Sequence, residues 1–208
     1  MVPTLGYLKE TPSQTAGPYV HIGLAPAQAG QAFAGKTISN KLAGPDTPGE
    51  RITIEGRVFD GTGTPIRDAL IECWQADANG RYNCHEDLPG GADHDGFAGF
   101  GRCGSDFETG LFSFETIKPG VVPGRNGVQQ APHISLWIVA RGLNVGLQTR
   151  LYFSEETAAN AADPVLNTIE QEARRQTLIA ERISTGDVAV YRFNIHLQGA
   201  EETVFFDI

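Results

Sequence analysis

The sequence predicts a mainly β fold, a sandwich or barrel of short strands joined by long loops. About seven short apolar segments are separated by turn residues, which is the pattern of such folds. Glycine (25) and proline (12) are numerous among the 208 residues, and no long helical pattern dominates. The length suits one domain, and a hydrophobic content of 40% is sufficient for a packed core.

The segment RITIEGRVF (51–59) shows the strand pattern most clearly, because Ile52 and Ile54 fall on one face and polar residues on the other. GLFSFETI alternates in the same way, with Phe112 and Phe114 on one face. The other expected strands are ALIECWQA (69–76), HISLWIVARG (133–142), QTRLYF (148–153), AVYRFNIHLQ (189–198) and TVFFDI (203–208).

The pattern divides the chain into an extended N-terminal arm (1–50) and a β core domain (51–208). The arm is rich in proline and glycine, has apolar islands and lacks periodicity, so we expect it to lie on another surface. A short helical segment is expected over 163–182, because Pro164 follows a plausible N-cap at Asp163.

Charge and cysteine content narrow the functional classes. The net charge of −9 comes without a basic stripe, which argues against a nucleic-acid binder. No apolar run is long enough to span a membrane, and the N-terminus does not resemble a signal peptide. The odd cysteine count, Cys73, Cys84 and Cys103 without a CxxC spacing, favours reduced thiols. We therefore expect a cytoplasmic protein.

A long irregular loop over 80–109 contains polar residues that invite a metal interpretation. Their spacing fits no common metal motif, which favours a surface loop. Ser135 follows His133 by two residues, but no GxSxG elbow supports a Ser–His–Asp triad. The polar residues of the loop are His85, Glu86, Asp87, His94 and Asp95.

Two longer runs are more specific, WQADANGRY (74–82) and FETIKPGVVPGRNGVQQAPHIS (114–135). Together they resemble the intradiol ring-cleaving dioxygenases, non-haem ferric enzymes that split catechols between the two hydroxyl groups. The resemblance extends to LKETPSQTAGPYVHIGL (8–24) and RFNIHLQGAEETVFFDI (192–208), so it covers essentially the whole chain. It implies a β-sandwich of the intradiol dioxygenase type.

The resemblance also implies where iron ligands would stand. In the family, two tyrosinates, two histidines and a hydroxide hold the hard ferric ion and neutralise its charge. The matching positions here are Tyr82, Val122, His133 and Ser135. Val122 offers no donor atom, and Gly124 stands where the family has a tryptophan. We therefore expect a relict site that binds no Fe(III).

The narrower resemblance is to the iron-free α chain of a two-chain family member. It implies a homologous iron-binding β chain as partner, in an α–β hetero-oligomer that converts protocatechuate and O2 to 3-carboxy-cis,cis-muconate. Two alternatives stay open. One is a metal-free β-sandwich module for assembly or binding. The other is a stand-alone catechol dioxygenase, which the missing ligands and the lack of a helical N-terminal domain disfavour.

The arm motif TAGPY carries a further implication of the resemblance. In the family this segment lines the substrate cavity of the partner chain, which assigns that role to Thr15, Gly17, Pro18 and Tyr19. Glycine suits a close approach of backbone to ligand. A positive charge near the cavity would help to admit an anionic substrate. The candidates are Arg141 and, more weakly, Arg125.

Overall fold

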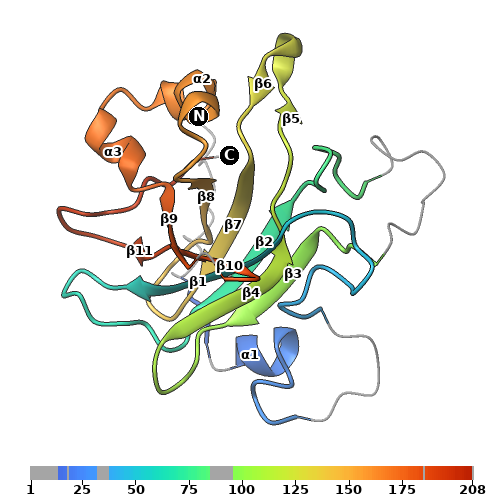
Figure 1. Ribbon diagram of the computed structural model, residues 1–208. Helices are drawn as coiled ribbons and strands as arrows, with labels where there is room; N and C mark the ends of the chain where they lie inside the picture. Colours follow the sequence, from blue (N-terminus) through green and yellow to red (C-terminus); the bar gives the residue numbers. More distant parts are fainter. Residues whose placement is uncertain (1–13, 18, 32–37, 85–95, 185, 208) are drawn as a thin grey trace, which may run out of the picture.

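A computed structural model describes residues 14–17, 19–31, 38–84, 96–184 and 186–207, which form a mainly β structure (Figure 1). The helices are α1 (Tyr19–Leu24), α2 (Thr157–Ala162) and α3 (Glu172–Gln176), with 3-10 turns η1 (Arg125–Gly127) and η2 (Leu166–Thr168). The strands are β1 (Arg51–Phe59), β2 (Leu70–Gln75), β3 (Phe100–Gly104), β4 (Leu111–Ile117), β5 (Val122–Pro123), β6 (Gln129–Gln130), β7 (His133–Val139), β8 (Leu147–Phe153), β9 (Ile179–Ser184), β10 (Ala189–Arg192) and β11 (Ile195–His196).

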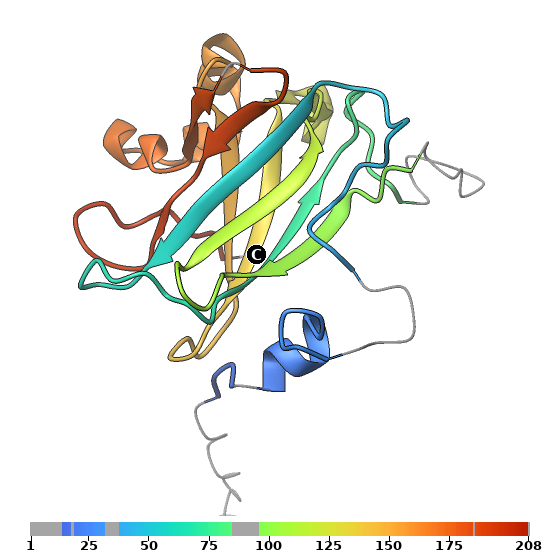
Figure 2. The same ribbon diagram turned by 60° about the horizontal axis from the view of Figure 1, so that its bottom comes forward.

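The strands form two layers that pack face to face. One layer runs β3-β2-β7-β8 with antiparallel neighbours. The other contains β4, β1 and β10, and β1 pairs antiparallel with β4 and parallel with β10. Strand β9 connects the layers, because it pairs with both β8 and β10. Figure 2 shows β1 and β4 lying across the strands of the layer behind them.

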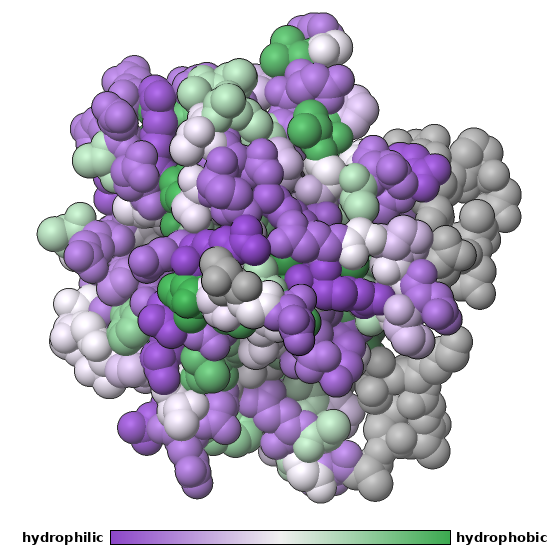
Figure 3. Space-filling view, in the orientation of Figure 1, coloured by the Kyte–Doolittle hydropathy of each residue, from purple (hydrophilic) through white to green (hydrophobic). Residues whose placement is uncertain are grey.

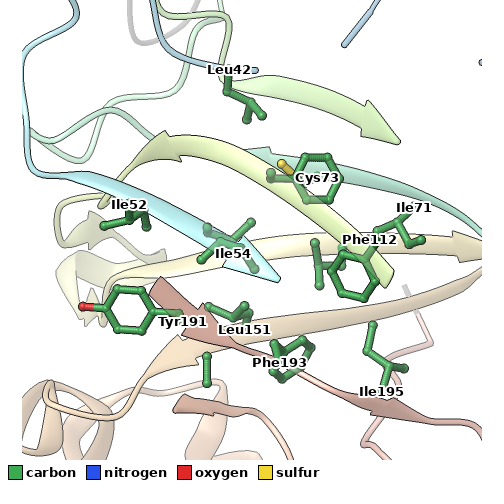
Figure 4. Packing of buried hydrophobic residues seen from close by; sticks show 14 of the residues in the cluster. Leu42, Ile52, Ile54, Ile71, Cys73, Phe112, Leu151, Tyr191, Phe193 and Ile195 are labelled. Atoms are coloured by element: carbon green, nitrogen blue, oxygen red, sulfur yellow. The ribbon is translucent and has the colours of Figure 1, made fainter. Parts of the chain in front are cut away.

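The core fills the space between the layers, as the period of two predicts. Burial alternates along all nine residues of β1. Ile54 and Phe112 from one layer pack in the same cluster as Ile71 and Leu151 from the other (Figure 4). The predicted mainly β sandwich is therefore confirmed.

The helix expected over 163–182 is wrong for most of its length. Only the short elements η2 and α3 form, and the last part of the segment is strand β9. Ile179 and Ala180 pair with Tyr152 and Phe153 of β8, and Ala180 is fully buried. Pairing with two strands therefore overrides the local helical preference.

Two strand expectations also differ from the structure. The loop over 80–109 contains β3, which pairs with β2. Its inward positions are Gly101, opposite Cys73, and Cys103, opposite Ile71, so its sequence shows no alternation of large apolar side chains. At Gly101 an added Cβ would lie 2.4 Å from Leu42. Conversely, residues 203–207 of the expected strand TVFFDI form only an isolated bridge, between Gln148 and Phe206.

The last part of the predicted arm belongs to the core of this chain. Leu42 is almost completely buried in the main cluster, and its N–H donates to the Glu115 carbonyl oxygen of β4. Arg51 donates to backbone carbonyl oxygens at Pro45 and Thr47. Residues 38–50 therefore act as a strap over the sandwich, whereas packing of the arm on a partner stays a prediction.

The face of the molecule in Figure 3 is mainly hydrophilic, with scattered apolar side chains. This agrees with the acidic composition. Within the described ranges, no helix has the length and apolar character needed to cross a membrane.

Asp163 organises the edge of the sandwich where the expected helix is replaced by short turns. Its carboxyl group is fully buried and accepts hydrogen bonds from the backbone N–H groups of Ala131, Val165 and Leu166, each at 2.8 Å. The Tyr152 hydroxyl donates to it at 3.2 Å. One side chain thus links β8, the start of β7 and the turn before η2.

We expect Asp163→Ala to destabilise the protein by at least about 3 kcal/mol, because several buried donors lose their acceptor at about 1–3 kcal/mol each. Asp163→Asn keeps one oxygen acceptor and should cost clearly less. Urea or thermal unfolding measures both changes. Asp187→Ala, at an exposed position, is the matched control. If Asp163→Ala unfolds like this control, the assigned role of Asp163 is wrong.

Candidate functional site

Two loops meet where the sequence predicts the relict metal site. Gly80 has a φ of +77°, and an added Cβ there would lie 1.9 Å from the Val121 carbonyl oxygen. An added Cβ at Gly120 would lie 2.5 Å from the Ala78 carbonyl oxygen of the other loop. Only glycine permits both approaches. The contact carries Tyr82, just after the first loop, towards β7.

Tyr82 and His133 form the pair that the sequence predicts. The Tyr82 hydroxyl lies 3.4 Å from His133 Nε2. The tyrosine ring stacks on Trp74 of β2, with a centroid distance of 5.8 Å and an interplanar angle of 6°. His133 is 1% exposed. Stacking and the hydrogen bond therefore hold the two side chains together without a metal ion.

The surroundings of His133 favour its neutral form. Burial is the main cause that lowers its pKa to about 4, and the nearby Arg150 cation lowers it further. Nδ1 lies 2.7 Å from the Ala131 carbonyl oxygen, which requires the proton on Nδ1. Nε2 is then an acceptor that faces the Tyr82 hydroxyl.

The other two positions that match the family's iron ligands hold an apolar side chain and a neutral hydroxyl. Val122 lies in β5, pairs with Gln130 of β6 and is 4% exposed. Ser135 lies two residues after His133 on β7, at the wall of an open groove of ≈ 510 Å³. Trp74 and Trp137 line the same groove.

This donor set does not fit ferric iron. One phenol and one imidazole remain, and a hard trivalent ion needs several anionic donors to be held. Arg150 stands opposite Ser135 in the β7–β8 register, which places a further cation beside the site. In the part of the chain that the structure describes, no group of three or more His, Cys, Asp or Glu side chains could hold a metal ion.

The structure brings two of the predicted cavity residues together. The Gly142 N–H donates to the Thr15 hydroxyl oxygen at 2.8 Å, so the arm contacts the loop that carries Arg141. Arg141 forms an ion pair with Asp68, at 3.0 Å from Nε to Oδ2. Tyr19 is 81% exposed at the start of α1. Gly17 lies between Thr15 and Tyr19 in the sequence, and its φ is not positive. An added Cβ at Gly17 would meet no atom within 4 Å.

Several other sequence predictions have separate outcomes. Two of these predictions lie outside the described residues. They concern Pro18 and the polar cluster of the long loop, which consists of His85, Glu86, Asp87, His94 and Asp95. A catalytic triad gains no support, because the contacts of the His133 ring nitrogens are Tyr82 and Ala131. Arg125 is exposed at the tip of the β5–β6 hairpin, which projects from the body in Figure 1. Cys73, Cys84 and Cys103 are free, as predicted.

Sequence reasoning missed Arg150 and Asp68. Arg150 donates to the Gln130 side-chain oxygen at 2.8 Å, and Asp68 has the contact given above. Asp163 was expected as an N-cap, and it does accept from the backbone N–H groups of Val165 and Leu166, but its bonds to Ala131 and Tyr152 were not foreseen. Polar positions in the predicted strand QTRLYF could have indicated Arg150. Their partners depend on strand register, which the sequence does not display.

The low pKa of His133 predicts a pH dependence of stability. The pKa in the folded chain (about 4) lies below the value of 6.5 for an exposed histidine, so the unfolded chain binds the proton first. The contribution of His133 is complete above pH 6.5 and is lost as the pH falls towards 4, by about 3 kcal/mol. Unfolding curves of wild type and His133→Gln should show a smaller loss for the variant across this range. Parallel pH profiles would contradict this expectation.

Comparison with known proteins agrees with this geometry. A family model described as dioxygenase matches residues 24–199. The protocatechuate 3,4-dioxygenase α chain of Pseudomonas putida is 52% identical over 200 residues, which are 96% of this chain and 97% of that one. The β chain of the Burkholderia cepacia enzyme is 35% identical over 160 residues, which are 74% of this chain and 67% of that one.

Solved structures give the same result. The dioxygenase domain of a dioxygenase–carbohydrate-binding protein fusion from Streptomyces sp. SirexAA-E has a TM-score of 0.56 and 27% identity. The match covers 92% of this chain and 100% of that chain. The family match over most of the chain, the 52% identity and the shared fold establish that this chain belongs to the intradiol dioxygenase family.

Proposed function

We propose that this chain is the iron-free α subunit of a cytoplasmic protocatechuate 3,4-dioxygenase. A homologous β chain binds the Fe(III), and the α–β assembly cleaves protocatechuate with O2 between its hydroxyl groups to 3-carboxy-cis,cis-muconate. The α chain contributes one wall of the substrate cavity. The observation that carries the proposal is the incomplete donor set at Tyr82, Val122, His133 and Ser135 in an otherwise intact family fold.

The position of the arm supports a role at a site on another chain. Thr15 contacts the loop after β7, whereas His133 begins β7. Eight residues separate His133 from Arg141, which in extended strand spans roughly 26 Å. Arg141 therefore cannot serve the relict site of its own chain. A substrate near Thr15 and Arg141 has to be held by a different centre, and the β chain is the proposed source.

The test of this function is to purify the chain with and without a co-expressed β chain. Alone, it should be colourless, hold no stoichiometric iron and consume no O2 with protocatechuate, because two neutral protein donors do not retain Fe(III). With β, iron, a visible tyrosinate band and O2 uptake should appear together. Stoichiometric iron in the isolated chain would refute the relict site. If the β chain is equally active without this chain, this chain serves only as an assembly module.

A second prediction concerns the arm. Gly17 has open space around it in this chain, so Gly17→Val should leave its folding intact. In the α–β enzyme the added side chain would meet the substrate or the partner. Overpacking costs about 1–3 kcal/mol, and we expect kcat/KM to fall about tenfold while iron content is unchanged. Gly186→Val, in an open loop with only Ser184 Oγ nearby at 3.7 Å, is the matched control. Wild-type kcat/KM in both variants would contradict a cavity role for the arm.

A further inference from the structure

We propose that Asp68 is a positioning residue for Arg141 and sets the affinity of the enzyme for the carboxylate of its substrate. The inference rests on the proposed function, in which Arg141 faces an anionic aromatic acid. The direct observation is the ion pair of Arg141 Nε with Asp68 Oδ2 at 3.0 Å. The contact is an ion pair at the Nε side of the guanidinium group, and among the described residues no side-chain nitrogen of Arg141 makes a hydrogen bond.

The register of the sheet preorganises this pair. In the antiparallel pairing of β2 with β7, Leu70 stands opposite Val139. Continued by two residues beyond the strand ends, the same register places Asp68 opposite Arg141. Cross-strand neighbours of opposite charge stabilise such a pair. Both residues lie in turns just beyond the ends of the paired strands, and the strand pairing brings these two turns close together.

The backbone on both sides of the pair is fixed. Ala69 and Ala140 are fully buried. The Ala69 N–H donates to Ser105 Oγ at 3.0 Å, and the Leu143 N–H closes a turn onto the Ala140 carbonyl oxygen at 3.1 Å. Asp68 and Arg141 thus project from anchored backbone, which is the support that a binding side chain needs.

The arm is attached at the same place. Gly142, with a φ of +90°, directs its N–H to the Thr15 hydroxyl. That hydroxyl also lies 3.4 Å from the Ala140 carbonyl oxygen. The predicted cavity segment therefore contacts the residues on either side of Arg141. We call Thr15, Asp68 and Arg141 the arm junction.

The chemistry of the guanidinium group explains what Asp68 contributes. Arginine presents five N–H donors in a planar fork, and its two terminal nitrogens match a carboxylate in bidentate geometry. The Arg141 side chain is 67% exposed, so without a support it would lose rotamer freedom on binding a ligand. Asp68 contacts the Nε side and leaves both terminal nitrogens without an ion-pair partner among the described residues.

Asp68 also has an opposite effect, because its negative charge repels the substrate anion. The two effects can be separated by variants of the α–β enzyme. Asp68→Asn keeps an oxygen that can accept from Nε but removes the charge, whereas Asp68→Ala removes both. If positioning dominates, Ala weakens binding and Asn restores most of it. Salt screens both the exposed ion pair and the exposed charge repulsion, so the comparison of the Asn and Ala variants, and not ionic strength, separates the two effects.

The experiment is a double-mutant cycle in the assembled, iron-loaded enzyme, with Asp68→Ala, Arg141→Ala and the double variant. The readouts are the Kd of protocatechuate without O2, and KM and kcat with O2. We expect Asp68→Ala to raise Kd and KM for protocatechuate about two- to fivefold, the range that exposed ion pairs give, with little change in kcat. Catechol, which lacks the carboxylate, should be much less affected. In the Arg141→Ala background, Asp68→Ala should not weaken binding further.

The outcomes separate this inference from the proposed function. Unchanged protocatechuate binding in Arg141→Ala would overturn the cavity role of Arg141 itself. If Arg141→Ala weakens protocatechuate binding and Asp68→Ala weakens it further by its full single-variant effect, Arg141 keeps its cavity role. Positioning by Asp68 is then refuted. A lower Kd in Asp68→Ala would show that Asp68 competes with the ligand, which also refutes it. The matched control is Glu55→Gln, which breaks the Glu55–Arg192 ion pair (2.9 Å) of the other layer and should bind as wild type.

Discussion

The antiparallel register of β2 and β7 is the constraint on which both functional regions depend. At one end of this strand pair, Gln75 stands opposite Ile134, and the loop that follows β2 brings Tyr82 to His133. At the other end, the same register leads to Asp68 and Arg141. A slip by one residue would turn every side chain of a strand to the opposite face. It would bury Ser135 and expose Leu136 and Ile138, so the core fixes the register that the sites use.

The pair of Tyr82 and His133 has a structural role in this chain. An imidazole without a metal ion needs partners for both nitrogens, and here a backbone carbonyl and a phenol provide them. Arg150 supplies positive charge in the same region, held by the Gln130 oxygen. Burial is the main cause of the low pKa of His133, and protonation would also place a second cation beside Arg150. The surroundings therefore stabilise the neutral imidazole.

Sequence patterns predicted the strands whose inward positions carry large apolar side chains in alternation with polar ones. β1 and β4 alternate clearly, and their observed bounds lie within the predicted segments. β3 could not be found in this way, because Leu42 of the strap fills the space over Gly101. β9 was read as helix because its partners lie in distant strands. The ligand positions came from motifs, but the contacts of Arg150 and Asp68, and those of Asp163 beyond its capping bonds, become visible only in the folded chain.

The charge of the chain constrains how the arm junction could act on an anion. With a net charge of −9, the chain as a whole repels an anionic ligand, so long-range attraction cannot be the source of affinity. Asp68 further reduces the field of Arg141 at distances beyond a few ångströms. What remains is short-range: a planar guanidinium group held in one orientation by an ion pair. Such a site discriminates by geometry after encounter and changes dissociation more than association. If the proposed function holds, the arm junction would act on a carboxylated aromatic ring by this short-range geometry.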